Sequence, residues 1–343
     1  MDSGPKRIGS LFGADRLFVV PPYQRSYAWR NQQLKDFLDD LSVHDAAKDY
    51  FLGTCLFQET ILPDGFERVD VVDGQQRLTT VVVLMKCLAD EFARRSPGRD
   101  VSLLGRRYLR DGDRVKLQVQ QSEREFFNTF VIGDVRPTQF EFPSQRRLHF
   151  AKEFFREALS ARGDTELEAL RAKVEGATVL TYSVKDTGEA TLIFETVNDR
   201  GKGLSDLEKV KSFLMYRTYQ VAEHPADQLN DIQSRFGDIF RAIDDLDQLR
   251  ARVDENALLR YQYIANFDWV PKKSEKPYDH AIREIKLHFD GILSDRDKAL
   301  EQISWYSADL RDCVAAVLSL HRDGSESVRN LFVLDRMANS GRC

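Results

Sequence analysis

The chain has 343 residues, too many for one small domain and suited to two or three. Hydrophobic residues make up 42% and charged residues 31%, which supports sizeable cores and excludes a disordered chain. Lys and Arg number 50 against 55 Asp and Glu, so the net charge of −5 excludes binding of nucleic acid through bulk charge alone. The four cysteines have no metal-binding spacing and no apolar run approaches the roughly 20 residues of a membrane span, so we expect free thiols in a cytoplasmic protein without a membrane partner.

The first 75 residues mix short strand-like runs with turns. β-branched and aromatic residues predict strands over 17–20, 51–57 and 68–72, and apolar residues at helical spacing predict a helix over 32–41. From residue 76 to Phe92 apolar residues follow one helical stripe and also occupy other faces. We therefore expect a long helix that is buried on more than one side.

Further along the chain the predicted strands become fewer. Strands are predicted over 115–119 and 177–184, and residues 190–197 suit either a helix or a strand-to-helix corner. Thr165 with Glu168, and Ser205 with Glu208, have the spacing of capping boxes that open helices.

After about residue 216 the pattern is helical throughout. We therefore predict an α+β fold in which a small mixed sheet in residues 1–215 is followed by a mostly helical region, 216–343.

Residues 94–116 are locally basic. This stretch holds eight Lys or Arg and three Asp, a net charge of +5 within a chain whose total charge is negative. Charge is therefore segregated along the sequence, and the segment offers salt-dependent contacts to nucleic-acid phosphates.

The strongest local signal is the sequence VDVVDGQQRLTT, in which a strand runs into a glycine turn and a helix opens directly behind it. Free N–H groups at a helix start form an anion site, Gly74 lets a phosphate approach the backbone, and Arg77 can form a fork onto phosphate oxygens. Asp73 could hold a metal-bound water or accept a proton, and Gln75 and Gln76 could orient a water or a ribose hydroxyl. The structural alternative, with even weight, is that Asp73 caps the helix and the glutamines are solvated.

A second signal is the sequence VPPYQRSYAWR, which starts at residue 20. Arg25 and Arg30 offer phosphate contacts. Tyr23, Tyr27 and Trp29 could stack on a base or pack in a core, and for aromatic side chains a place in the core is the commoner outcome.

A third signal is the glycine-rich stretch over residues 194–209. Asn198, Arg200 and Lys209 cluster around this turn, just before a capped helix. The turn is either a second phosphate or DNA contact or a simple corner between helices.

Together these segments resemble the N-terminal domain of GmrSD-type, modification-dependent restriction enzymes. The family pattern P-x-Y-Q-R-x-Y-x-W, F-L-G, I-D-G-Q-Q-R-L-T-T and F-E-x-x-N-x-R-G-x-x-L is matched, in that order, at Pro21–Trp29, Phe51–Gly53, Val72–Thr80 and Phe194–Leu204. The resemblance implies a ParB/sulfiredoxin-like core with helical insertions. It also implies binding and hydrolysis of a nucleoside triphosphate, GTP foremost, with a magnesium ion.

The resemblance also implies roles for residues. It assigns catalysis to Asp73, Gln75, Gln76 and Arg77, with Asp73 also at the metal. It assigns nucleotide binding to Gly74, Arg77, Gln24, Arg25, Asn198, Arg200 and Lys209. Within the family the chain is most similar to members that respond to phosphorothioate-modified DNA. This similarity implies that the modified DNA backbone is recognised by Pro22, Tyr23, Gln24, Trp29 and Arg30.

Members of this type continue into a C-terminal nuclease half with an HNH signature. No such signature follows residue 216, so we expect this chain to lack the cutting domain and to cut no DNA itself. Two functions stay open: a triphosphatase coupled to the sensing of modified DNA, and a nucleotide-gated DNA-binding module that hydrolyses nothing. The expected partners are a nucleoside triphosphate and DNA, and an oligomeric assembly stays open.

Overall fold

The computed structural model describes residues 3–43, 50–184, 205–249, 251, 253–266 and 281–323. The chain divides into two compact units, residues 1–194 and residues 195–343. This division comes earlier than the domain boundary that we expected at residue 215, which falls inside a helix of the second unit. Each unit is described by itself.

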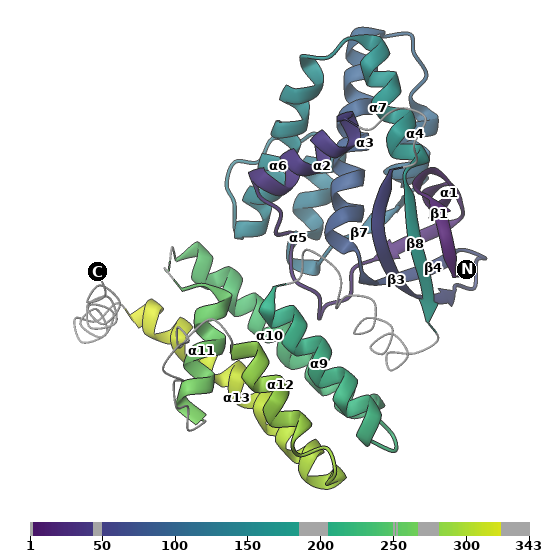
Figure 1. The fold of residues 1–343 in the computed structure, drawn as a ribbon. Helices are drawn as coiled ribbons and strands as arrows, with labels where there is room; N and C mark the ends of the chain where they lie inside the picture. The colour runs from purple at the N-terminus through teal and green to yellow at the C-terminus, as the bar shows by residue number, and fades with distance from the viewer. Residues whose placement is uncertain are drawn as a thin grey trace. The chain divides into compact units, whose positions relative to one another are not determined.

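A mixed sheet of six strands forms the centre of the first unit (Figure 1). Its order is β1-β8-β3-β4-β2-β7, with β1 antiparallel to β8, β3 antiparallel to β4 and the other neighbours parallel. The strands are β1 (Gly4–Arg7), β2 (Arg16–Val19), β3 (Phe51–Ile61), β4 (Glu67–Asp73), β7 (Leu117–Gln118) and β8 (Thr178–Val184). The strands predicted over 17–20, 51–57, 68–72 and 177–184 are confirmed.

Helices α2, α3, α6 and α7 gather beside this sheet (Figure 1). The helices of the first unit are α1 (Ile8–Gly13), α2 (Asn31–Val43), α3 (Gln75–Arg95), α4 (Ser102–Tyr108), α5 (Gln121–Phe126), the π-helix η1 (Phe127–Ile132), α6 (Pro143–Ser160) and α7 (Asp164–Gly176). Every residue of α3 from Leu78 to Ala89 is buried, which confirms a helix packed on more than one side.

Two local predictions are wrong. The strand predicted over 115–119 is split, because β6 (Arg114–Val115) pairs with β5 (Arg110–Asp111) in a separate hairpin, whereas β7 pairs with β2. The switch falls at Lys116, whose side chain is buried and donates to the carbonyl of Ala14 at 2.8 Å.

The second wrong prediction is the capping box of α7. The N-cap is Gly163, whose N–H donates to the carboxylate of Glu166 at 2.7 Å. The predicted pair, Thr165 and Glu168, lies inside the helix. Because a glycine has no side-chain acceptor, it gives no capping signal in the sequence, and the N-cap was predicted at Thr165, two residues after Gly163.

The described part of the second unit consists of helices. They are α9 (Asp206–Val221), α10 (Ala226–Gln248), α11 (Glu255–Asn266), α12 (Ala281–Asp290) and α13 (Arg296–Asp323), and they share an apolar core that includes Phe236 and Tyr306. The predicted capping box of α9 is confirmed, since the Glu208 N–H donates to Ser205 Oγ at 3.3 Å and the Ser205 N–H donates to Glu208 Oε2 at 2.8 Å. A mixed sheet followed by a helical region confirms the α+β prediction, and none of the described helices has the length and apolar character to cross a membrane.

Candidate functional site

The DGQQR sequence forms a tight corner where β4 meets α3. Gly74 caps the helix with φ of 94°, in the left-handed region that favours glycine. A Cβ atom at Gly74 would lie 2.4 Å from the Sγ atom of Cys55, a fully buried residue of β3. Burial raises the pKa of the Cys55 thiol to about 12, so this packing partner is uncharged and unreactive.

The first turn of α3 has no side-chain cap, although Gly74 and Gln75 are themselves buried. Gly74 provides no side-chain cap, and within the described residues no protein acceptor is bonded to the main-chain N–H groups of Gln75, Gln76 or Arg77. The structural alternative in which Asp73 caps the helix is therefore wrong. Three N–H groups at the positive end of a 21-residue helix can receive an anion.

The guanidinium of Arg77 turns back from α3 onto β3. It donates to the carbonyl oxygens of Leu52 at 3.2 Å and Thr54 at 2.6 Å, and it contacts the carboxylate of Asp73 at 3.3 Å. A Cβ atom at Gly53 would lie 2.0 Å from Arg77 Nη1, so the glycine of the F-L-G motif makes the room for this arginine. Arg77 thus holds the corner to the sheet, and a quarter of its side chain stays exposed beside Asp73.

The two glutamines bind the loop that carries the P-x-Y-Q-R sequence. Gln76 accepts from the main-chain N–H of Ala28 at 2.8 Å and donates to the carbonyl of Ser26 at 3.1 Å. They are therefore not simply solvated, and the side chain of Gln76 clamps the loop to the helix.

Gln24 makes the corresponding contact from the loop side. Its amide donates to the carbonyl of Val72 at 2.5 Å, directly before Asp73, and accepts from the amide of Gln75 at 3.4 Å. Two segments about 50 residues apart in sequence are therefore joined at the corner by side-chain hydrogen bonds.

Other polar residues that support the loop gave no sequence signal. The amide of Gln120 donates to the carbonyls of Pro21 at 2.9 Å, Pro22 at 3.3 Å and Gln24. The carboxylate of Glu123 accepts from the N–H of Tyr27 at 2.8 Å. Both residues are buried and lie about 100 residues beyond the loop in sequence, so only the fold reveals these contacts.

The aromatic side chains of the loop divide between core and surface. Tyr27 is buried, with its hydroxyl 2.9 Å from Thr80 Oγ1 on α3, and burial raises its pKa. Trp29 packs edge-on against Phe37 with ring centroids 5.7 Å apart. Pro22 is exposed, and Tyr23 and Trp29 are half-buried, so part of the apolar surface of the loop is accessible to a ligand.

The remaining predicted residues are described one by one. Arg25 is half-buried and Arg30 is exposed, with the Arg30 N–H donating to Gln33 at 2.9 Å. Asn198 and Arg200 lie outside the described residues. Lys209 belongs to α9 of the second unit, where its ammonium pairs with Asp206 at 2.8 Å.

The corner offers a metal one carboxylate. Across the described ranges no three His, Cys, Asp or Glu residues gather as a ready-made metal site. Magnesium commonly takes one or two protein carboxylates and completes its shell with phosphate oxygens and water. Asp73 therefore fits a magnesium ion that arrives with a triphosphate, and it does not fit an all-protein metal cage.

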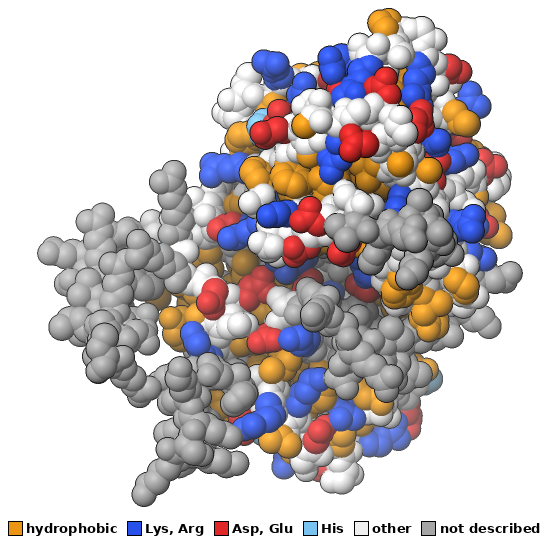
Figure 2. Space-filling view, turned by 45° about the horizontal axis from the view of Figure 1, so that its top comes forward, with side chains coloured by type: hydrophobic (Ala, Val, Ile, Leu, Met, Phe, Trp, Pro, Cys, Tyr) orange, Lys and Arg blue, Asp and Glu red, His pale blue; other side chains and the backbone are white. Residues whose placement is uncertain are grey.

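The basic segment 94–116 is largely neutralised. Five of its seven arginines pair with carboxylates, at Arg94–Glu91, Arg95–Asp164, Arg99–Glu168, Arg107–Glu175 and Arg114–Asp64. Figure 2 shows the same mixture, with Lys and Arg beside Asp and Glu over the face drawn. Most of the positive charge of this segment is therefore neutralised by neighbouring carboxylates, and the segment does not form one continuous basic patch.

Comparison with known proteins gives the family. The model of the GmrSD restriction endonuclease N-terminal domain matches residues 8–215, more than half of the chain. The chain belongs to this family. The matched GmrSD range contains all four motif segments, so the resemblance is confirmed, and it points to a restriction protein of phage defence. None of the curated proteins compared with the chain matches it.

Proposed function

We propose that this GmrSD-family chain binds and hydrolyses a nucleoside triphosphate at the DGQQR corner and couples turnover to the sensing of modified DNA. The observation that carries the proposal is the set of main-chain N–H groups in the first turn of α3. The N–H groups of Gln75, Gln76 and Arg77 have no acceptor among the described residues, and they belong to the same turn as the partly exposed guanidinium of Arg77, which contacts Asp73. A triphosphate needs this combination of fixed donors and a metal-ligating carboxylate.

In this proposal the residues of the corner have separate tasks. Asp73 would give a magnesium ion one ligand, and the ion would neutralise charge on the phosphates. Gly74 and the N–H groups of Gln75 and Gln76 hold phosphate oxygens. Arg77 fixes the corner on β3 and meets the ligand only with its exposed edge. Water then attacks the terminal phosphorus and gives up a proton to solvent, the bond from that phosphorus to the bridging oxygen breaks, and inorganic phosphate and a nucleoside diphosphate leave.

The loop beside the corner would read the DNA modification. A sulfur that replaces a phosphate oxygen is softer and less hydrated, and the exposed Pro22 with the half-buried Tyr23 offers it an apolar surface. Gln24 connects this surface with the carbonyl before Asp73, and Gln76 clamps the following residues to α3. Contact with a phosphorothioate would thus act on the corner through two side chains.

A second candidate function is nucleotide-gated DNA binding without hydrolysis. This function is favoured because the side chains of Gln76 and Arg77 are bound to main-chain groups of the protein. Few side chains at the corner are then left to activate a water molecule.

A phosphate-release assay separates the two functions. The four triphosphates are each incubated with the chain and magnesium, with and without phosphorothioate-modified duplex, and nucleotide binding is measured in parallel. Release that grows with time supports the proposal. Binding with a flat trace supports the gated module, and the absence of binding to any triphosphate would remove both.

A further inference from the structure

The loop that carries the P-x-Y-Q-R sequence lies against a distant segment of the first unit, the chain that leads from β7 into α5. β7 pairs with β2 in parallel, with Val19 opposite Gln118, and the N–H of Val20 donates to the carbonyl of Gln118 at 2.8 Å. β2 ends at Val19 and β7 ends at Gln118, so the two strands end together and Gln120 lies beside Pro21. The contact between the loop and this segment therefore follows from the register of the sheet.

Gln120 uses its side chain on the loop and not on its own helix. It is the N-cap residue of α5, yet its side chain makes no capping hydrogen bond. Its amide nitrogen instead donates to the carbonyl oxygens of Pro21 at 2.9 Å, Pro22 at 3.3 Å and Gln24. Because Gln120 is buried, water competes little for these hydrogen bonds.

The three bound carbonyls belong to the part of the loop that carries its exposed apolar surface. Tyr23 lies between two residues whose carbonyls Gln120 binds, Pro22 and Gln24. A proline has no N–H, so the carbonyl is the only main-chain group through which Pro21 or Pro22 can form a hydrogen bond. Gln120 therefore fixes the direction of the main chain on both sides of Tyr23.

Gln120 also has an indirect connection to the DGQQR corner, through Gln24. The main-chain carbonyl of Gln24 accepts from Gln120, and the side-chain amide of Gln24 donates to the carbonyl of Val72 at 2.5 Å, directly before Asp73. Within the described residues the side chain of Gln120 itself bonds to the loop and to no residue of β4 or α3. Its effect on the corner must therefore pass through the loop.

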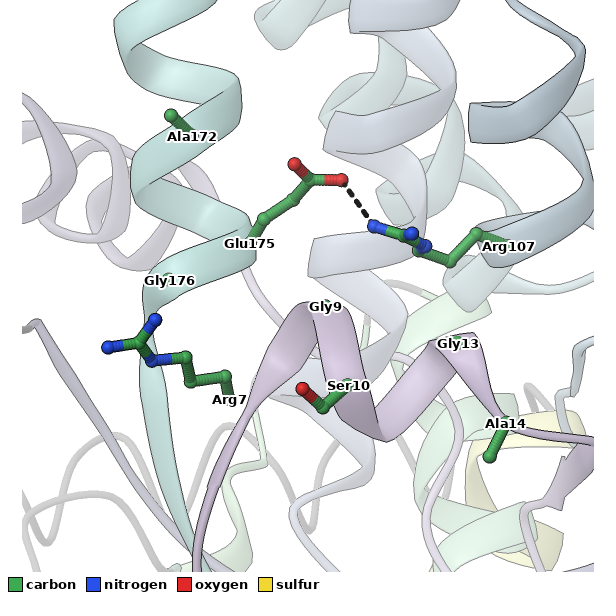
Figure 3. Close-up of a pocket in the computed structure, with 9 residues that line it drawn as sticks. All are labelled: Arg7, Gly9, Ser10, Gly13, Ala14, Arg107, Ala172, Glu175 and Gly176. Carbon is green, nitrogen blue, oxygen red and sulfur yellow. Dashed lines mark hydrogen bonds and ion pairs between the residues drawn. The ribbon is translucent and has the colours of Figure 1, made fainter.

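A hollow elsewhere on the first unit takes no part in these contacts. It has a volume of about 670 Å³ and is lined mainly by residues of α1 and α7 (Figure 3). Its carboxylate, Glu175, extends to Arg107 at 3.0 Å, and none of its lining residues belongs to the loop or to the segment that leads into α5. The contacts that orient the loop are therefore independent of this hollow.

We infer that Gln120 is a positioning residue for recognition of the DNA modification. By binding three carbonyls of the loop, it keeps Pro22 and Tyr23 in the arrangement that contacts a modified phosphate. The inference rests on the proposed function, in which this loop reads phosphorothioate-modified DNA. Such a residue controls the preference for modified over ordinary DNA, whereas binding of a triphosphate does not depend on it.

The test compares Gln120→Met with Gln121→Met in the full chain. Methionine is unbranched like glutamine, but its end carries no N–H donor. Gln121 is the next residue and is exposed, so its substitution is the matched control. Binding of a phosphorothioate duplex, and of the same duplex without sulfur, is measured in the absence of nucleotide. We expect Q120M to weaken binding of the phosphorothioate duplex roughly tenfold and to leave binding of the ordinary duplex and of a triphosphate unchanged, while Q121M alters none of the three.

A second variant separates positioning from folding. Gln120→Asn keeps the amide but shortens the side chain by one methylene, so it should lose the same preference, and circular dichroism shows which variants fold. The inference is wrong if folded variants keep the preference of the unaltered chain, if they bind both duplexes equally more weakly, or if neither variant folds, because Gln120 then supports the fold alone. If the unaltered chain itself binds both duplexes equally, the proposed sensing is wrong, and this inference is wrong with it.

Discussion

Gly74 and Cys55 illustrate how closely the residues at the corner fit. Replacing Gly74 with Ala adds a Cβ atom 2.4 Å from a buried sulfur at a backbone angle that alanine rarely adopts. We expect G74A to lower the free energy of unfolding by about 3 kcal/mol or more. The matched control is Gly65→Ala, which has φ of 86° and open space around it, and should cost about 1 to 2 kcal/mol.

Chemical denaturation measures both variants. The double variant G74A/C55A removes the sulfur and should recover part of the loss, because the collision is gone and only the backbone strain stays. Equal stability of G74A and G65A would contradict the packing described for the corner.

Glu91 on α3 makes stability depend on pH. Hydrogen bonds from Arg94 and Arg95 lower the pKa of its carboxyl from 4.5 to about 2. Because the folded-state pKa is the lower one, the stabilisation is complete above pH 4.5 and is lost as the pH falls through 2.

The variant Glu91→Gln tests this dependence. At pH 7 we expect its free energy of unfolding to be about 1 to 2 kcal/mol lower than that of the unaltered chain. This value allows for solvent screening of the ion pair, because Arg94 is exposed. Denaturation curves from pH 7 to pH 2 should show the difference shrinking below pH 4.5. A difference that stays constant down to pH 2 would exclude a lowered pKa at Glu91.

At the scale of an element, the π-helix η1 depends on one lysine of α6. The buried ammonium of Lys152 donates to the carbonyls of Phe130 at 2.6 Å and Val131 at 3.0 Å, and pairs with Asp134 at 2.5 Å. It thereby satisfies carbonyls at the end of the π-helix that would otherwise be buried without a donor.

We expect Lys152→Met to lower the free energy of unfolding by about 2 to 4 kcal/mol. Hydrogen exchange should also become faster in residues 127–132. Lys35→Met, at an exposed position of α2, is the control and should change neither quantity. If both variants behave alike, the lysine does not stabilise the π-helix.

Sequence patterns predicted the helices and strands whose own residues show a clear local composition or periodicity. Runs of β-branched and aromatic residues predicted the strands, and helical periodicity predicted the long apolar helix α3. The strand β1 was not predicted, because it consists of GPKR and depends on pairing with β8, about 170 residues away. The helix α1 and the switch at Lys116 were also missed, since both depend on contacts with distant segments.

The site was predicted in part. The corner at Asp73 and Gly74 follows from a strand, a glycine and a helix in succession, and the structure has that geometry. The contacts of Gln76 with the loop and of Arg77 with β3 could not be derived, because nothing local in the sequence indicates which distant carbonyls a side chain will meet. Those contacts change the expected tasks of both residues from free reagents to groups that hold the corner.

At the scale of the whole molecule, each unit has its own apolar core. One buried cluster contains residues between Ile8 and Val179, and another contains residues between Leu207 and Leu318. We expect calorimetry to resolve two unfolding transitions. Phe57→Ala should lower the temperature of one transition by several degrees, and Phe236→Ala that of the other. A single transition lowered by both variants would show that the units unfold together.

The central claim is that Asp73 takes part in the turnover of a triphosphate. The direct measurement is phosphate release by Asp73→Asn beside Asp70→Asn, a change of the same kind in the same strand at a carboxylate that pairs with Arg68. We predict that D73N loses at least about 100-fold in rate while its melting temperature and circular dichroism match those of D70N, which keeps full activity. Equal rates of phosphate release in the two variants would contradict the account.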